Sequence, residues 1–214
     1  MTFSQAYQDK FALKLNDSKK DGTYLELGTN HPITHNNTYL LESKYNWSGL
    51  LIEYDKSFES LYPKTRPKSK YIIGDARVLD YNKILEKTFS TRTIDYLQID
   101  LDADNCSTLT SLLLLSEFVM PKYKFKTVTF EHDSYRGNFF NTRALSREIF
   151  KRHGYQLIFP DVSVMWQGSY KPFEDWYVYP ELISKETLEN ITGHEKYVFG
   201  KSFTCDEINS LFLN

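Results

Sequence analysis

The chain has 214 residues, of which 41% are hydrophobic and 25% are charged, and its formal net charge is −2 at neutral pH. This length fits one domain with a sizeable core. The nearly balanced charge argues against a nucleic-acid partner, whose phosphates require a clustered basic surface. The one basic run, 64-KTRPKSK-70, is interpreted as a solvated loop between two strands.

Cysteine usage and hydropathy restrict the compartment. The two cysteines, Cys106 and Cys205, are too few for a disulfide scaffold or a thiolate metal site. The N-terminus lacks a basic segment followed by an apolar one, and the longest apolar run, 112-LLLL-115, is too short to span a bilayer. These features predict a cytoplasmic protein that makes no membrane contact.

Strand-like and helix-like segments alternate along the chain. Apolar residues at Ala6, Phe11, Ala12 and Leu15 predict an amphipathic helix over 4–15. The expected strands are 23–28, 49–55, 70–76, 94–102 and 126–133, followed by 155–161 and 173–180, which a loop joins. Helices are expected near 36–45, 57–62, 80–87, 105–117 and 140–153.

This alternation predicts an α/β fold. We expect a single Rossmann-like domain over 1–214, with a mostly parallel seven-stranded sheet covered by helices on both faces. After the N-terminal helix over 4–15, the cofactor half is expected over 23–103 and the acceptor half over 104–214.

Each of the first five expected strands ends in an acidic residue. These residues are Glu26, Glu53, Asp75, the pair Asp100 and Asp102, and the pair Glu131 and Asp133. Ligands of open α/β sheets bind beyond the carboxyl ends of the strands. Facing carboxylates repel each other unless a cation or hydrogen-bond donors lie between them. The pattern therefore predicts a ligand at this edge.

The first strand is followed by the single glycine Gly28, whereas NAD and ATP need several glycines to bring backbone N–H groups close to their phosphates. S-adenosylmethionine carries no phosphate, and its sulfonium and ammonium groups suit a carboxylate near Glu26. Glu53 could accept hydrogen bonds from its ribose diol, and Asp75 from its adenine amine. These features favour S-adenosylmethionine, while an NAD-dependent oxidoreductase is an alternative because NAD sites also place an acid after the second strand.

The segments SQAYQDKFAL, GTYLELGTNHP, NNTYLLE, WSGLLIEYD and IDYLQIDLDAD, in this order, resemble the FkbM-type S-adenosylmethionine-dependent methyltransferases over residues 4–135. The resemblance implies a class I methyltransferase that methylates oxygens, often sugar hydroxyls, so the expected partner is a small-molecule or glycan acceptor. The family usually reads Asp-x-Glu-Gly where this chain has Asp100-Leu101-Asp102-Ala103. The residues expected to bind the cofactor are Gln5, Gln8, Glu26, Gly28, Asn30, Asn37, Thr38, Glu53, Asp75, Ala76 and Asp100.

Transfer to a hydroxyl requires a general base, a metal that acidifies the hydroxyl, or both. His132 and Asp102 are the expected catalytic residues. Asp100, Asp102, Glu131 and His132 resemble the Mg²⁺ site of metal-dependent small-molecule O-methyltransferases and could bind Mg²⁺ or Mn²⁺. The metal-free alternative has His132 as the base, with an acid orienting its ring.

The acceptor is expected to lie over the strand ends. Tyr135, Arg136, Asn138 and the loop 163–176, with Trp166, Tyr170 and Trp176, could shape its pocket. A second alternative function is a catalytically inactive methyltransferase-like binding domain of a larger glycan-building enzyme.

Overall fold

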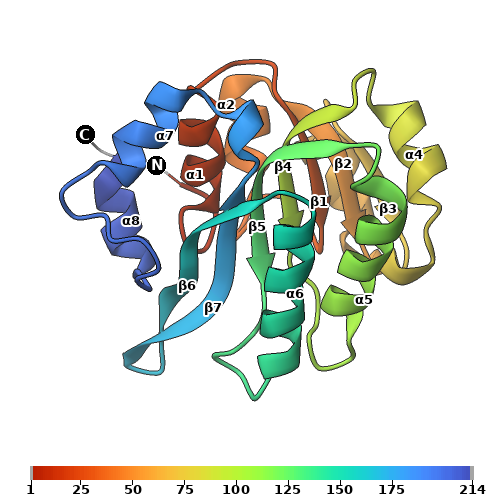
Figure 1. The fold of residues 1–214 in the computed structure, drawn as a ribbon. Helices are drawn as coiled ribbons and strands as arrows, with labels where there is room; N and C mark the ends of the chain where they lie inside the picture. The colour runs from red at the N-terminus through yellow and green to blue at the C-terminus, as the bar shows by residue number, and fades with distance from the viewer. Residues whose placement is uncertain (1, 213–214) are drawn as a thin grey trace.

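The computed structural model describes residues 2–212 and contains a seven-stranded sheet with the strand order β3-β2-β1-β4-β5-β7-β6 (Figure 1). Five strands are parallel: β1 (Thr23–Leu27), β2 (Ser48–Glu53), β3 (Lys70–Ile73), β4 (Thr93–Ile99) and β5 (Lys124–Glu131). β7 (Ser169–Val178) runs antiparallel to β5 and forms a hairpin with β6 (Gln156–Trp166). The predicted mostly parallel seven-stranded sheet is confirmed. Strand order reverses between β1 and β4, which is where ligands bind in such sheets.

Helices cover both faces of the sheet, as predicted (Figure 1). One face carries α4 (Tyr81–Thr88), α5 (Ser107–Leu114) and α6 (Phe140–Arg152). The other carries α1 (Gln8–Leu15), α2 (Tyr39–Tyr45), α3 (Tyr62–Thr65), α7 (Lys185–Thr192) and α8 (Cys205–Phe212). Short 3₁₀ turns occur at Lys56–Leu61, Ala76–Val78 and Pro180–Leu182, and a π turn at Leu115–Val119 extends α5. Within residues 2–212, no helix combines the length and the hydropathy that crossing a bilayer requires.

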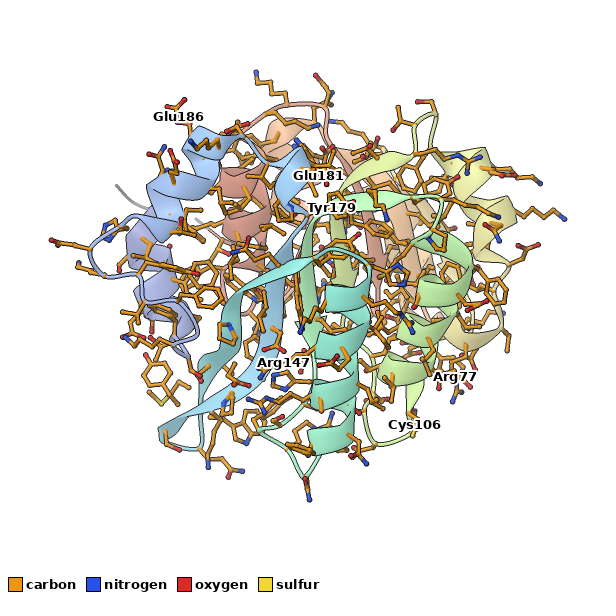
Figure 2. The ribbon with its side chains drawn as sticks, viewed as in Figure 1. Arg77, Cys106, Arg147, Tyr179, Glu181 and Glu186 are labelled. Carbon is orange, nitrogen blue, oxygen red and sulfur yellow. The ribbon has the colours of Figure 1, made fainter. Side chains whose placement is uncertain are left out.

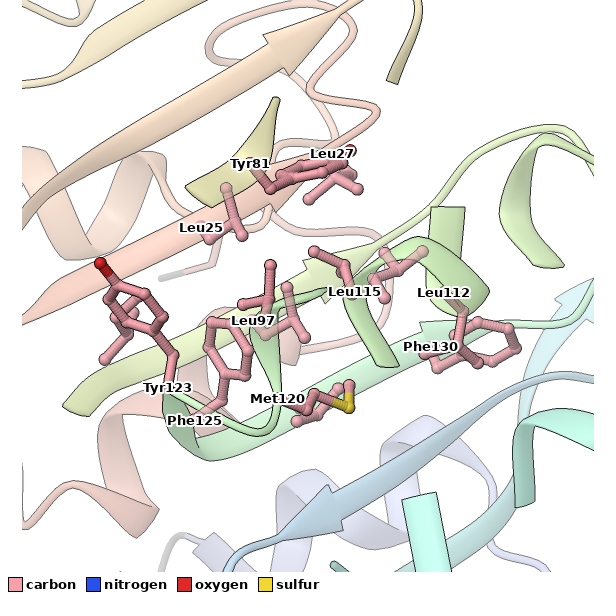
Figure 3. Packing of buried hydrophobic residues seen from close by; sticks show 14 of the residues in the cluster. Leu25, Leu27, Tyr81, Leu97, Leu112, Leu115, Met120, Tyr123, Phe125 and Phe130 are labelled. Atoms are coloured by element: carbon pink, nitrogen blue, oxygen red, sulfur yellow. The ribbon is translucent and has the colours of Figure 1, made fainter. Parts of the chain in front are cut away.

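The two faces of the sheet differ in polarity. On the α5 face, alternate residues such as Leu25, Leu27 and Leu97 pack against Leu112 and Leu115 in one apolar cluster (Figure 3). The residues between them point to the α1 face, since side chains alternate along a strand. Several of these are buried and polar, namely Glu26, Gln98, Thr127, Thr129 and Glu131. Burying so many polar groups costs free energy. These polar residues extend along the strands toward their carboxyl ends.

Several element boundaries differ from the prediction. The first helix begins at Gln8 rather than at residue 4, because Tyr7 has a left-handed backbone (φ +67°) that an α-helix cannot include. The predicted loop 163–176 is wrong, since β6 continues to Trp166 and β7 begins at Ser169. Gln167 and Gly168, both with positive φ, make the turn between them. The sequence did not predict α7 and α8.

The interpretation of the basic run 64–70 as a solvated loop is also wrong in part. Arg66 is only 1% exposed, and its Nε donates to Glu42 at 2.9 Å. The same guanidinium donates to the Tyr24 hydroxyl at 2.7 Å and to Thr38 Oγ1 at 2.6 Å. A buried arginine needs such partners, so this residue ties the segment before β3 to α2 rather than facing solvent.

Candidate cofactor and acceptor site

A cavity of about 600 Å³ lies at the carboxyl ends of β1, β2, β4 and β5, at the lower edge in Figure 1. Its lining residues are Gln5, Gly28, Asn30, His31, Thr34, His35, Glu53, Tyr54, Asp100, Leu101, Asp102, Glu131, Asp133, Tyr135 and Arg136. A smaller cavity of about 180 Å³ adjoins it and shares Tyr54, Leu101 and Asp102. Another cavity, of about 690 Å³, is lined by residues at the opposite end of the sheet, where the strands begin. Ligand sites of this fold lie at the carboxyl ends, so the two adjoining cavities are the candidate site.

Gly28 forms the floor of the larger cavity, and no other residue fits there. Its φ is +83°, and a Cβ added to it would lie 1.6 Å from the carbonyl oxygen of Asp100. Gly28 lies between Glu53 on β2 and Asp100 after β4, because the residues that follow Leu27, Ile52 and Ile99 lie side by side. The Asp100 backbone packs against the position that a side chain would take, so no side chain covers the floor here. A ligand can therefore approach the backbone between two carboxylates.

Backbone groups hold Glu53 in place. One carboxylate oxygen accepts from the Asn30 N–H at 2.5 Å, and the other from the Asp55 N–H at 2.7 Å. Tyr62 fixes Asn30 in turn, since its hydroxyl donates to the Asn30 carbonyl at 2.7 Å. Each carboxylate oxygen has a further lone pair, and Glu53 lines the cavity. This arrangement suits recognition of two adjacent hydroxyls.

Asp75 and Ala76 line the smaller cavity together with Arg77. Arg77 donates to Asp75 from Nε at 2.9 Å and from Nη2 at 2.7 Å, and this pairing lowers the pKa of Asp75 below its usual range. Arg77 also reaches the Asn105 carbonyl, and Figure 2 shows it close to Cys106. A ligand amine would have to share the Asp75 carboxylate with this arginine.

Glu26, Asn37 and Thr38 do not line either cavity. Glu26 is 1% exposed and accepts from Thr38 Oγ1 at 2.8 Å and from the Asn37 N–H at 3.3 Å. Burial raises its pKa to about 7, although Arg66 opposes the shift. These residues form a buried network behind Gly28. Of the two predicted glutamines, Gln5 lines the cavity, whereas Gln8 is buried.

Three carboxyl groups stand side by side across β4, β5 and β7, and we call them the carboxyl row: Asp100, Glu131 and Glu174. Ile99 pairs with Phe130, so the next residues, Asp100 and Glu131, are neighbours, and Glu131 pairs directly with Glu174. Burial raises the pKa of Asp100 to about 6, and burial together with the Asp100 charge raises that of Glu131 well above its usual range. The Asp100 and Glu131 carboxyls are adjacent, so the charge of each opposes ionisation of the other.

His132 points to the opposite face of the sheet. Its Nε2 lies 3.5 Å from Asp161 Oδ1 and 3.8 Å from Asp175 Oδ1, and its Nδ1 lies 2.9 Å from Ser134 Oγ. Arg143 donates to Asp161 at 2.6 Å, and Arg147, labelled on α6 in Figure 2, donates to both oxygens of Asp175 at 2.7 Å. These five residues, His132, Asp161, Asp175, Arg143 and Arg147, form the ion-pair cluster.

The ion-pair cluster balances its own charge. Burial opposes ionisation of Asp161, but the neighbouring His132 ring, the hydrogen bonds from Arg143 and the charge of Arg147 lower its pKa below the usual range. Within residues 2–212, His132, Asp161 and Asp175 are also the one group that brings three metal-ligand atoms within 4.8 Å of one another. Two arginines already neutralise the two carboxylates, so a cation would be repelled there.

The structure thus divides the residues predicted to bind a metal. Asp100, Asp102 and Glu131 line the larger cavity, whereas His132 is absent from its lining. Asp102 is open to solvent and lies 3.8 Å from Arg136. Alternation along the chain, with Glu131 and Asp133 on one side and His132 on the other, was visible in the sequence.

Other lining residues were missed. The cavity wall also includes His31, His35 and Tyr54, which no sequence motif indicated. His31 Nδ1 accepts from the Thr34 N–H at 3.1 Å, so its proton is carried on Nε2. Glu174 was also missed, and its position opposite Glu131 depends on a strand register that the sequence does not show.

No family model and no curated protein matches the chain. Its fold resembles solved structures at low sequence identity. Cofactor-bound Rv0187 from MTB aligns with a TM-score of 0.52 and 12% identity over 82% of this chain and 80% of that protein. A protein assigned as an rRNA methylase from Clostridium thermocellum aligns with a TM-score of 0.51 and 11% identity over 83% and 98%. One assigned as an RNA methyltransferase from Pyrococcus horikoshii gives 0.50 and 12% over 81% and 82%.

The chain has a Rossmann-like methyltransferase fold. At such identities the likeness establishes the architecture, and it leaves the FkbM-type resemblance of the sequence as a prediction. Function has to be argued from the site itself.

Proposed function

We propose that this protein is an S-adenosylmethionine-dependent O-methyltransferase that acts on a hydroxyl of a small molecule or a glycan, assisted by a divalent cation. The observation that carries the proposal is the placement of Gly28 between Glu53 and Asp100. The floor of the cavity is bare backbone there, with a carboxylate on either side and a single glycine instead of a phosphate-binding loop.

The candidate site fits the cofactor in both charge and shape. Glu53 would accept from the ribose hydroxyls, while Asp75 and Ala76 line the adjoining cavity where the adenine would lie. Asp100 and Gln5 would face the methionine part. The cofactor, when bound, supplies an electrophilic methyl group on a sulfonium. Carboxylates favour such a cation, whereas they would repel a pyrophosphate.

The charge of the cavity also restricts the acceptor. Five carboxyl groups line it, on Glu53, Asp100, Asp102, Glu131 and Asp133, against the single arginine Arg136. A polyanionic acceptor would meet a negative potential there. A neutral hydroxyl compound such as a sugar would not, and Tyr54 and Tyr135 offer it aromatic surface.

The chain's own residues can orient and deprotonate such an acceptor. Asp102 is exposed and carries its charge at the cavity rim, where it could accept the hydroxyl proton. Arg136, which contacts Asp102, Asp104 and Asp133, holds this rim together. We retain His132 as a predicted base only by way of Ser134 Oγ, since the imidazole itself is 0% exposed.

A divalent cation would be held by carboxylate oxygens of Asp100, Asp102 and Glu131, which is the chemistry that Mg²⁺ and Mn²⁺ prefer. It would lower the pKa of the acceptor hydroxyl. Asp100 and Glu131 are adjacent in the register of β4 and β5, and the repulsion between their carboxylates favours a cation here.

Calorimetry with S-adenosylhomocysteine tests the cofactor site directly. We expect the parent protein to bind, and Glu53→Ala to bind about 30-fold more weakly, since losing a charged acceptor for two hydroxyls costs about 2 kcal/mol. Glu117→Ala, an exposed glutamate in the π turn after α5, is the control and should bind like the parent. Absence of binding by the parent would refute the proposal, and unchanged affinity in Glu53→Ala would remove Glu53 from the site.

A further inference from the structure

Glu174 is the most buried member of the carboxyl row. Neither cofactor binding nor deprotonation of the acceptor explains why a carboxyl group is buried at this position. Its side chain is 0% exposed, and neither carboxylate oxygen has a hydrogen-bond partner. Gln8 and Trp176 are the donors that face it. The Trp176 Nε1–H is also buried and without a partner. A native structure rarely leaves such groups unsatisfied.

Among residues 2–212, no basic side chain is one of the main influences on Glu131 or Glu174, although Arg136 lies 3.5 Å from Asp133 Oδ2. The groups that act most strongly on Glu131 are Asp100, Asp133 and Glu174, all of them acids. Asp133 is 2% exposed, and its Oδ1 also lacks a partner. A carboxylate buried without a counter-charge costs several kcal/mol, so a missing positive ligand is the simplest account of the row.

We propose that Glu174 and Glu131, together with Asp100, bind a divalent cation that prefers oxygen ligands, such as Mg²⁺, Mn²⁺ or Ca²⁺. This inference deepens the proposed function and rests on it for the use of the metal. It replaces the histidine of the sequence-based metal site, His132, with a glutamate from β7. The bound cation would keep Asp100 and Glu131 ionised and hold them in one position beside the floor of the cavity.

The strand register permits this site. Cβ atoms of directly paired antiparallel residues such as Glu131 and Glu174 lie about 4.5–5.5 Å apart, and metal–oxygen distances are about 2.0–2.6 Å. One cation can therefore bridge the two carboxylates. The ligand atoms of the row are not gathered within 4.8 Å in the described residues, so Glu174 must rotate toward Asp100 when the cation binds.

Terbium luminescence provides a test that needs no acceptor. Tb³⁺ substitutes for hard divalent cations, and Trp176, which faces Glu174, would transfer excitation energy to it. We expect saturable luminescence from the parent protein that Mn²⁺ or Ca²⁺ displaces. Glu174→Gln should weaken binding at least tenfold, whereas His132→Gln should bind like the parent. Trp176→Phe should lose luminescence and still bind Mn²⁺, as measured by water-proton relaxation.

Three results would overturn the proposal: no saturable Mn²⁺ binding to the parent, unchanged binding in Glu174→Gln, or loss of binding in His132→Gln. If Glu174→Gln does not fold, Glu131→Gln makes the same comparison. Calorimetry with S-adenosylhomocysteine is run on each variant. A protein that binds the cofactor but no cation refutes this inference and the assistance by a cation, and it leaves the proposed methyl transfer standing. A protein that binds the cation but no cofactor refutes the proposed function.

Discussion

Two groups of buried charges flank the end of β5, and they differ in whether the protein neutralises them. In the ion-pair cluster, Asp161 and Asp175 receive hydrogen bonds from Arg143 and Arg147. In the carboxyl row, no basic side chain is among the main influences on Glu131 or Glu174. Consecutive residues of one segment, Glu131 and His132, belong to the two different groups.

This difference indicates that the ion-pair cluster is structural and that the carboxyl row is a candidate ligand site. A compensated cluster is complete without a ligand, because each buried charge already has its partner. An uncompensated row is costly in the isolated chain, and binding of a positively charged ligand can recover that cost. Perturbed acids without a partner mark functional sites for this reason. Under the proposed function, the chemistry would lie on the α1 face of β5, and the α6 face would have a supporting role.

The largest expected effect is the loss of stability when one arginine of the ion-pair cluster is removed. Arg147→Met would leave Asp175, which is 0% exposed, without its main partner. We expect the free energy of unfolding to fall by about 3–5 kcal/mol, measured by urea denaturation. Arg92→Met, in an exposed pair with Glu86, is the control and should change it by less than about 0.5 kcal/mol. A loss below about 1 kcal/mol in Arg147→Met would show that Asp175 does not depend on this arginine.

Glu26 is an intermediate case, buried but hydrogen-bonded near Arg66, and it should make stability depend on pH. Its pKa is about 7 in the folded protein and about 4.3 in an unfolded chain. The folded state therefore binds the extra proton between these values, so stability should fall as pH rises from about 4 to 7, by about 3 kcal/mol.

In Glu26→Gln this fall should disappear from a series of melting temperatures between pH 4 and pH 8. The exposed Glu117→Gln is the matched control and should keep the slope of the parent. An unchanged slope in Glu26→Gln would mean that its hydrogen bonds from Thr38 and Asn37 keep the carboxyl ionised throughout.

The sequence predicted most of what depends on local pattern. Hydrophobic runs located the strands, and the acids predicted at their ends lie at the edge of the sheet where the candidate site is. The pairing of Glu131 with Glu174 could not be predicted, because it depends on the antiparallel register of a strand some 40 residues away in sequence. The burial of Arg66 could not be predicted either, because its partner Glu42 lies far away in sequence, in α2. The opposite orientation of His132 was predictable from strand alternation.

Removing a charged group from the carboxyl row should raise the free energy of unfolding, whereas Arg147→Met in the ion-pair cluster should lower it. Glu174→Gln removes a potential buried charge and conserves shape, so we expect the cation-free protein to gain about 1 kcal/mol at pH 8. For a chain of this size the melting temperature should rise by about 2–4 °C. A comparable loss of stability, measured in the presence of chelator, would show that Glu174 has a stabilising partner within the protein.

The smallest expected effect is the change in cofactor affinity when His132 of the ion-pair cluster is replaced. The His132 ring is 0% exposed and lies against Asp161, so it cannot touch a ligand in the larger cavity. We expect His132→Gln to bind S-adenosylhomocysteine within about twofold of the parent, about 0.4 kcal/mol, even if it unfolds more easily. The thirtyfold loss expected for Glu53→Ala provides the scale for this calorimetric measurement. A tenfold weakening in His132→Gln would place the imidazole in contact with the cofactor site and would show that the ion-pair cluster contributes to binding.

Unchanged affinity would leave one way for His132 to act, as a base through Ser134 Oγ. Removing a base that acts in this way should lower turnover about 10²- to 10⁴-fold.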